Sequence, residues 1–118
     1  MIGQEEAGMA CMYNIYIYTF IGSPSITSLS LNRNTTTLTC ISTHGPATWK
    51  KNDQTLDIES SDYHECQRLV NAETSTYETD LVSDDLAMFV GVFTCTVSNN
   101  RGTVEKTLEL EGGLNLIF

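Results

Sequence analysis

Several segments of this chain alternate between apolar and polar residues with a period of two, the pattern of a β-strand with one buried face. The pattern runs through residues 37–40 (TLTC), 77–81 (YETDL), 93–98 (FTCTVS) and 104–111 (VEKTLELE). Lys106 is the one interruption on the apolar side of the last segment. We therefore expect antiparallel strands, each with one face in a core.

Turn-forming residues separate these segments at short intervals. They are NRN at 32–34, HGP at 44–46, ND at 52–53, SDD at 83–85 and NNRG at 99–102. The last group joins two alternating segments and so predicts a hairpin. A single helical turn is expected within residues 84–90 and no longer helix elsewhere. Short strands separated by such turns predict an all-β sandwich or barrel.

Composition limits the class of protein further. The chain has 118 residues, of which 41% are apolar and 18% charged, as in one folded globular domain. Its net charge of -9 would repel phosphate backbones and anionic membrane surfaces. We therefore expect no nucleic-acid partner.

The two ends of the chain are the segments that we place outside the domain, at residues 1–22 and 112–118. Residues 11–22 are mostly apolar, with Tyr, Ile, Met and Phe, which suits a secretion signal, but Glu5 and Glu6 precede them and no Lys or Arg does. The alternative is a segment that is not native to the fold. No run reaches the roughly 18 apolar residues of a membrane helix, so any membrane attachment would need an anchor in a parent protein.

The four cysteines allow three pairings if all are oxidised, and an even number suits an oxidising compartment. A zinc site would have to gather Cys11, Cys66, His44 and His64 from distant positions, against the usual close pairs of ligands. We therefore expect no metal site and no cofactor.

The residues around Cys40, Trp49 and Cys95 resemble the core of an immunoglobulin-superfamily domain. Residues 49–56 (WKKNDQTL) are similar to the family's strand C pattern W-x-K-N-G-x-x-L, with Asp53 in place of glycine. Residues 95–102 (CTVSNNRG) match C-x-V-x-N-x-x-G, the F strand and F–G turn of the intermediate set. The resemblance covers residues 23–111 and implies an immunoglobulin-like two-sheet antiparallel β-sandwich with Greek-key connections.

The resemblance to this family implies that Cys40 and Cys95 form a disulfide and that Trp49 packs against it. Closing a loop of about 55 residues would contribute roughly 4 kcal/mol to stability in the chain-entropy model. Two reduced, buried cysteines are the alternative if the chain is cytosolic.

The chain departs from the family before its second core cysteine. Where the family commonly has D-x-G-x-Y-x-C, this sequence has Phe89, Gly91 and Phe93. The acid and the tyrosine hydroxyl are therefore missing. We expect apolar packing to hold the E–F corner instead, with Met88 and Phe89 covering that end of the sandwich.

Three further features are candidates for chemistry. Cys66 could pair with Cys11, bridge to another chain or remain a free thiol. Asn34, in Asn-Thr-Thr, is the one N-glycosylation motif and is a polar turn if the chain is cytosolic. Residues 62, 84 and 85 are acidic but lack the alternating pattern of a calcium loop.

We expect no enzyme, because the two histidines, His44 and His64, belong to no nucleophile motif. The resemblance implies a recognition or adhesion module of the cell surface that binds a protein or glycan. Exposed loops on a rigid scaffold are the natural binding positions. The candidate residues are His44, Gly45 and Pro46 in the B–C loop and Asn99, Asn100 and Arg101 in the F–G turn.

Two alternatives remain. The chain could be a spacer in a tandem array, in a receptor ectodomain or an intracellular filament protein, that contacts neighbouring immunoglobulin domains. It could also be a freestanding secreted binder, which requires residues 1–22 to act as a leader. Fold alone does not decide among these functions.

Overall fold

The computed structural model describes residues 22–58 and 62–111. The described residues form eight strands and one short 3-10 helix. These are β1 (Ser25–Asn32), β2 (Thr37–Thr43), β3 (Thr48–Lys51), β4 (Gln54–Thr55), β5 (His64–Asn71), β6 (Thr76–Val82), η2 (Leu86–Phe89), β7 (Gly91–Asn99) and β8 (Gly102–Leu110). No helix in the described ranges is long and apolar enough to cross a membrane.

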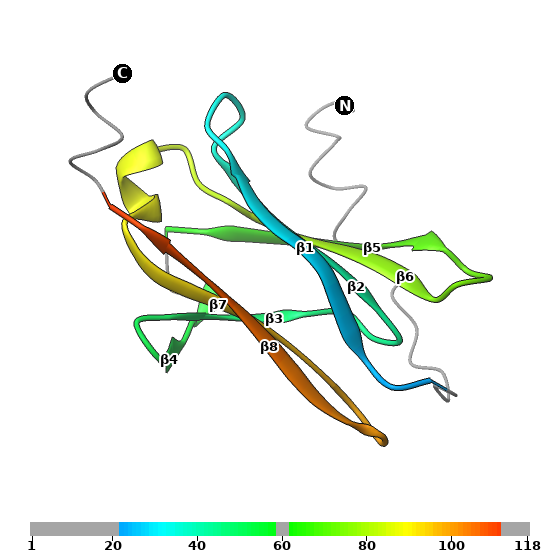
Figure 1. Cartoon of the computed structure of the whole chain (residues 1–118). Helices are drawn as coiled ribbons and strands as arrows, with labels where there is room; N and C mark the ends of the chain where they lie inside the picture. The colour runs from blue at the N-terminus through cyan, green and yellow to red at the C-terminus, as the bar shows by residue number, and fades with distance from the viewer. Residues whose placement is uncertain (1–21, 59–61, 112–118) are drawn as a thin grey trace.

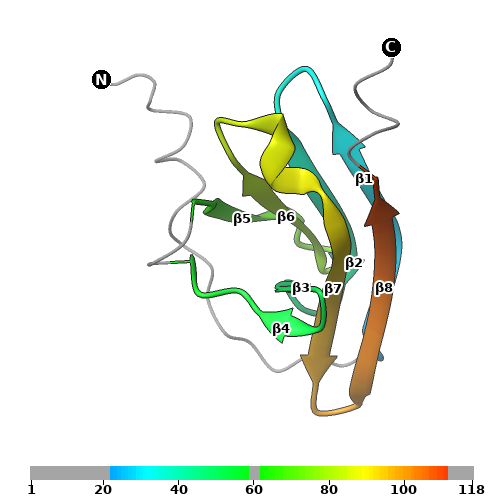
Figure 2. The ribbon, with the colours of Figure 1, turned by 90° about the vertical axis from the view of Figure 1, so that its left-hand side faces the viewer.

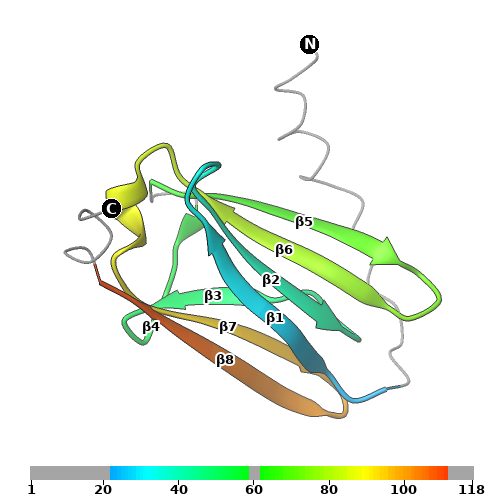
Figure 3. The same cartoon turned by 45° about the horizontal axis from the view of Figure 1, so that its top comes forward.

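The strands form two antiparallel sheets that pack face to face (Figure 1). One sheet has the order β1-β2-β6-β5 and the other has the order β4-β3-β7-β8. The chain changes sheet after β2, after β4 and after β6, so each hairpin is followed by a crossing to the opposite layer (Figure 3). This arrangement confirms the predicted immunoglobulin-like β-sandwich.

The strand register places the predicted apolar faces inside. Leu38 lies opposite Leu81, and Trp49 lies opposite Cys95. Directly opposite residues share one face of a sheet, so these pairs fill the space between the layers. The residues of the core are Leu38, Cys40, Ala47, Trp49, Tyr63, Leu81, Phe89, Phe93, Cys95 and Val97, each no more than 4% exposed. Lys106, which interrupts the apolar side of β8, is exposed at the edge of its sheet.

The two core cysteines are free thiols in this structure, so the expected Cys40–Cys95 disulfide is not formed. They come from β2 and β7, in opposite sheets, and both are fully buried. The pKa of Cys40 is raised well above its ordinary value, mainly by a hydrogen bond with Cys95 and secondly by burial. The two thiol groups therefore face each other across the core.

The E–F corner, residues 83–90, is held by apolar packing and by a polar group that we did not expect. The Phe89 ring is fully buried, 5.6 Å from the ring of Tyr63. The Tyr63 hydroxyl donates a hydrogen bond to the carbonyl of Met88 and accepts one of 3.0 Å from Lys51 Nζ. Because Tyr63 precedes β5, a residue from another segment supplies the hydroxyl that Phe93 lacks. The predicted helical turn of this corner is η2.

Candidate interaction surface

The B–C loop and the F–G turn lie at the same end of the sandwich, opposite η2 (Figure 1). Asn99, the last residue of β7, links them through its side-chain amide. The Asn99 Nδ2 group donates hydrogen bonds to the carbonyl of His44 at 2.8 Å and to the carbonyl of Gly22 at 3.0 Å. The structure therefore brings together the two loops that the sequence analysis selected. We call Gly22, residues 44–46 and residues 99–101 together the loop end.

The B–C loop has a fixed conformation. The Ser42 hydroxyl donates to the Gly45 carbonyl at 2.7 Å, and both groups lie in the buried base of the loop. His44 and Gly45 have positive φ angles of 63° and 147°. The His44 amide donates to the carbonyl of Ser75 at 2.8 Å, which ties the loop to the turn between β5 and β6.

The strand that follows the loop is anchored to the opposite sheet. The Ala47 amide donates to Thr79 Oγ1 at 3.1 Å, and Gln67 Nε2 donates to the Ala47 carbonyl at 3.0 Å. Side chains of β5 and β6 thus satisfy both backbone groups of a buried residue. The loop therefore rests on a rigid base.

The F–G turn presents its tip to solvent. Asn99 Oδ1 accepts a hydrogen bond of 2.7 Å from the Arg101 amide, which closes the turn. Asn100 and Arg101 are both exposed. Below the tip, the hydroxyl groups of Ser98 and Thr103 are 2.8 Å apart and join the two strands. The guanidinium of Arg101 is therefore a cationic group displayed on a closed hairpin.

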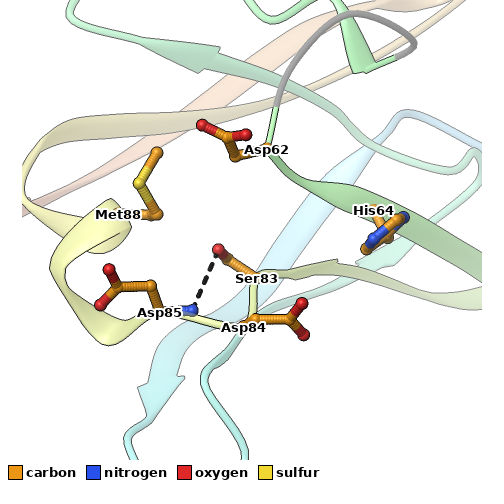
Figure 4. A pocket seen from close by; sticks show the side chains of 6 residues that line it. All are labelled: Asp62, His64, Ser83, Asp84, Asp85 and Met88. Carbon is orange, nitrogen blue, oxygen red and sulfur yellow. Dashed lines mark hydrogen bonds between the residues drawn. The ribbon is translucent and has the colours of Figure 1, made fainter.

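At the opposite end of the sandwich, a pocket of about 380 Å³ opens beside the E–F corner (Figure 4). Its lining residues are Asp62, His64, Ser83, Asp84, Asp85 and Met88. Two of its polar side chains form hydrogen bonds within the corner itself. Ser83 Oγ accepts one of 3.4 Å from the Asp85 amide, and the Asp85 side chain accepts one of 2.9 Å from the Ala87 amide. Among residues 22–58 and 62–111, no group of three or more His, Cys, Asp or Glu could hold a metal ion.

The remaining candidates are separated from the loop end. His64 begins β5, so the structure does not bring the two histidines together. Asn34 is exposed in the turn between β1 and β2, where a glycan would meet solvent. Cys66 is 8% exposed and lies opposite Asp80, on the face of its sheet away from Cys40. Cys11 lies outside the described residues, so a Cys11–Cys66 disulfide stays a prediction.

Sequence reasoning missed the part that Asn99 plays in this surface. The sequence predicts Asn99 to be an exposed turn residue, but it is only half-exposed and its amide points back to two other segments. The C-x-V-x-N-x-x-G pattern marked its position. The partners are 55 and 77 residues away in sequence, so no local pattern could name them.

The fold and the loop arrangement together define an immunoglobulin-like domain. No model of a protein family and no curated protein matches this sequence. Among solved structures, the chain is similar to the "Anomalous substructure of Titin-A168169", with a TM-score of 0.53 and 18% sequence identity. The similarity covers 76% of this chain and 48% of that one, so this chain spans about half of the titin structure. At this identity the similarity supports the immunoglobulin-like fold and does not distinguish the intermediate set from other sets.

Proposed function

We propose that this chain is a non-catalytic protein-interaction module that binds its partner through the loop end. The observation that carries the proposal is the amide of Asn99, which joins the B–C loop and the F–G turn into one surface. A preorganised surface loses less conformational entropy on binding than separate mobile loops would. Arg101, exposed at its tip, is the residue we expect to contact the partner most strongly, since Arg is enriched among the residues that dominate binding energies.

We place this module outside the cell, as an adhesion or recognition domain. Two features support that setting. The Cys40 and Cys95 thiols face each other and could be oxidised there. The glycosylation motif at Asn34 is exposed and lies at the end of the sandwich opposite the loop end, where a glycan would leave the binding surface accessible.

A spacer in a tandem array is the second candidate. The observation that favours it is the similarity to a titin structure of about twice the matched length. In that function the loop end would contact a neighbouring domain of the same polypeptide, and the cysteines would remain reduced in an intracellular filament protein.

A binding screen separates the two functions. The chain would be fused to a multimerising scaffold, so that weak binding is strengthened by avidity, and tested against a library of receptor ectodomains. Wild type, Arg101→Glu and Arg33→Glu would be compared in parallel. Arg33 is an exposed arginine in the turn between β1 and β2, so its variant makes the same charge change at the other end. We expect one partner whose affinity falls at least about tenfold with Arg101→Glu, as for the loss of a charged contact, and is unchanged with Arg33→Glu. No partner, or an equal loss in both variants, would contradict binding through the loop end.

A further inference from the structure

The side-chain amide of Asn99 has no unused donor. An asparagine amide carries two N–H donors, and here one goes to the His44 carbonyl and the other to the Gly22 carbonyl. The side-chain oxygen of Asn99 accepts a hydrogen bond from the backbone N–H of Arg101. One side chain therefore bonds the F–G turn, the B–C loop and the point where the chain approaches β1.

A second contact joins Gly22 to the B–C loop independently of Asn99. A Cβ atom built on Gly22 would lie 2.3 Å from Nε2 of His44, so the imidazole ring lies directly against the Gly22 backbone. The same ring has its Nδ1 atom enclosed without a hydrogen-bond partner. His44 thus contacts Gly22 through packing, while Asn99 holds the carbonyls of both residues.

The loop end is also attached to the turn between β5 and β6 by the bond from the His44 amide to the Ser75 carbonyl. Exposed loops ordinarily open independently of one another, with free energies near zero. Here three loops and the approach to β1 share a connected set of hydrogen bonds around a single amide. A displacement of one of these segments must break bonds to the others.

We propose that the hydrogen bonds of the Asn99 side chain couple the conformations of the F–G turn and the B–C loop to the orientation of the backbone at Gly22, where the chain enters β1. The backbone of Gly22 would then be held in a fixed orientation relative to the loop end, and a partner on the F–G turn would strengthen that coupling. The effect of a partner rests on the proposed function. The coupling itself is a property of the free chain and is tested without a partner.

The variant Asn99→Asp removes the two hydrogen bonds that Asn99 donates and keeps the one that it accepts within the F–G turn. It keeps an oxygen to accept the Arg101 amide, but it loses both N–H donors and places a carboxylate beside two carbonyl oxygens. Asn100→Asp is the matched control, because it adds the same charge at an exposed neighbour whose side chain takes no part in these contacts.

The measurement is hydrogen–deuterium exchange of the full chain, followed in peptides that cover residues 22–28, 42–48 and 90–98. With Asn99→Asp we expect exchange to rise about tenfold in both of the first two segments, as for the loss of one or two hydrogen bonds, with the core strand unchanged. Asn100→Asp should leave all three unchanged. Unchanged exchange at either of the first two segments in Asn99→Asp would overturn the proposal.

If Asn99→Asp does not fold, Gly22→Ala tests the same coupling from the other side. Its new methyl group would displace the His44 ring, and the variant leaves residue 99 as asparagine. We expect faster exchange in residues 42–48 and in the F–G turn as well as at residue 22. Loosening confined to the residues next to Gly22 would refute the coupling, whatever the outcome of the search for a partner.

Discussion

Asp80 is a carboxylate with an unusual environment on the outer face of the β1-β2-β6-β5 sheet. Its Oδ1 atom is buried without a hydrogen-bond partner. Partial burial, helped by the neighbouring Glu78, raises the pKa of Asp80 from 3.8 to about 6. The folded chain therefore binds a proton at this position more strongly than the unfolded chain does.

This single residue makes stability depend on pH. Its contribution is fully present below about pH 4, where both states are protonated, and is lost as the pH rises to about 6. We expect Asp80→Asn to raise the free energy of unfolding at pH 7 by about 1 kcal/mol, a value reduced because the side chain is partly screened by solvent. Urea unfolding at pH 4 and pH 7 measures the difference from wild type.

Asp84→Asn is the control for Asp80→Asn, because Asp84 is an exposed carboxylate. It removes the same formal charge, so it reports the effect of lowering the net negative charge of the whole chain. If the two variants differ from wild type equally at both pH values, the environment of Asp80 is not the cause.

At the scale of elements, the E–F corner is joined to β3 and to the segment before β5 by one tyrosine. The Tyr63 hydroxyl bonds the Met88 carbonyl in η2 and Lys51 Nζ at the end of β3. Its ring lies 5.6 Å from Phe89 and 6.2 Å from Phe93, both in edge-to-face geometry. The corner therefore depends on a contact among three segments.

Tyr63→Phe tests this corner because it removes the hydroxyl and keeps the ring. We expect a loss of about 1 to 3 kcal/mol in the free energy of unfolding, since the Met88 carbonyl and Lys51 Nζ each lose their bond to the hydroxyl and keep only a longer bond of 3.4 Å to each other. Chemical denaturation measures it. Val90→Ala, at an exposed residue of the same corner, should change stability by less than about 0.5 kcal/mol. A loss no larger than that of Val90→Ala would show that apolar packing alone holds the corner.

The sequence predicted those elements whose signal is local. Alternation identified β7 and β8, and the positive φ angles of Asn52 and Asp53 fit the turn expected there. The hydroxyl of Tyr63 and the amide of Asn99 escaped prediction because their partners lie in other segments. Such contacts depend on how the two sheets pack, which a period of two along one strand does not encode.

For the molecule as a whole, the thiols of Cys40 and Cys95 are the place where one covalent bond could join the two sheets. The two sheets lie face to face (Figure 2). Cys40 and Cys95 are fully buried in the core that the sheets enclose. The hydrogen bond between the two thiols raises the pKa of Cys40 and lowers that of Cys95, but both side chains are fully buried, so an oxidant in solution cannot reach either one while the domain is folded. We therefore expect oxidation to require refolding or transient opening.

Oxidative refolding is the test of whether the core accepts the bridge. A Cys40–Cys95 disulfide would close a loop of about 55 residues, which is worth roughly 4 kcal/mol in the chain-entropy model. We expect wild type to gain most of this on oxidation, measured by urea unfolding with and without reductant. Peptide mapping without reduction identifies the pair.

The double variant Cys40→Ala/Cys95→Ala is the control for that gain, because it keeps every other cysteine. Any effect of the reductant on its stability comes from the remaining cysteines, so the gain from Cys40–Cys95 is the difference between the wild-type effect and this one. In reductant it should be less stable than wild type, because two buried side chains become smaller. A wild-type chain that refolds without the bridge would contradict the prediction. Reduced cores suit an intracellular compartment, so that outcome would favour the spacer, whereas a bridge that forms readily suits a domain outside the cell.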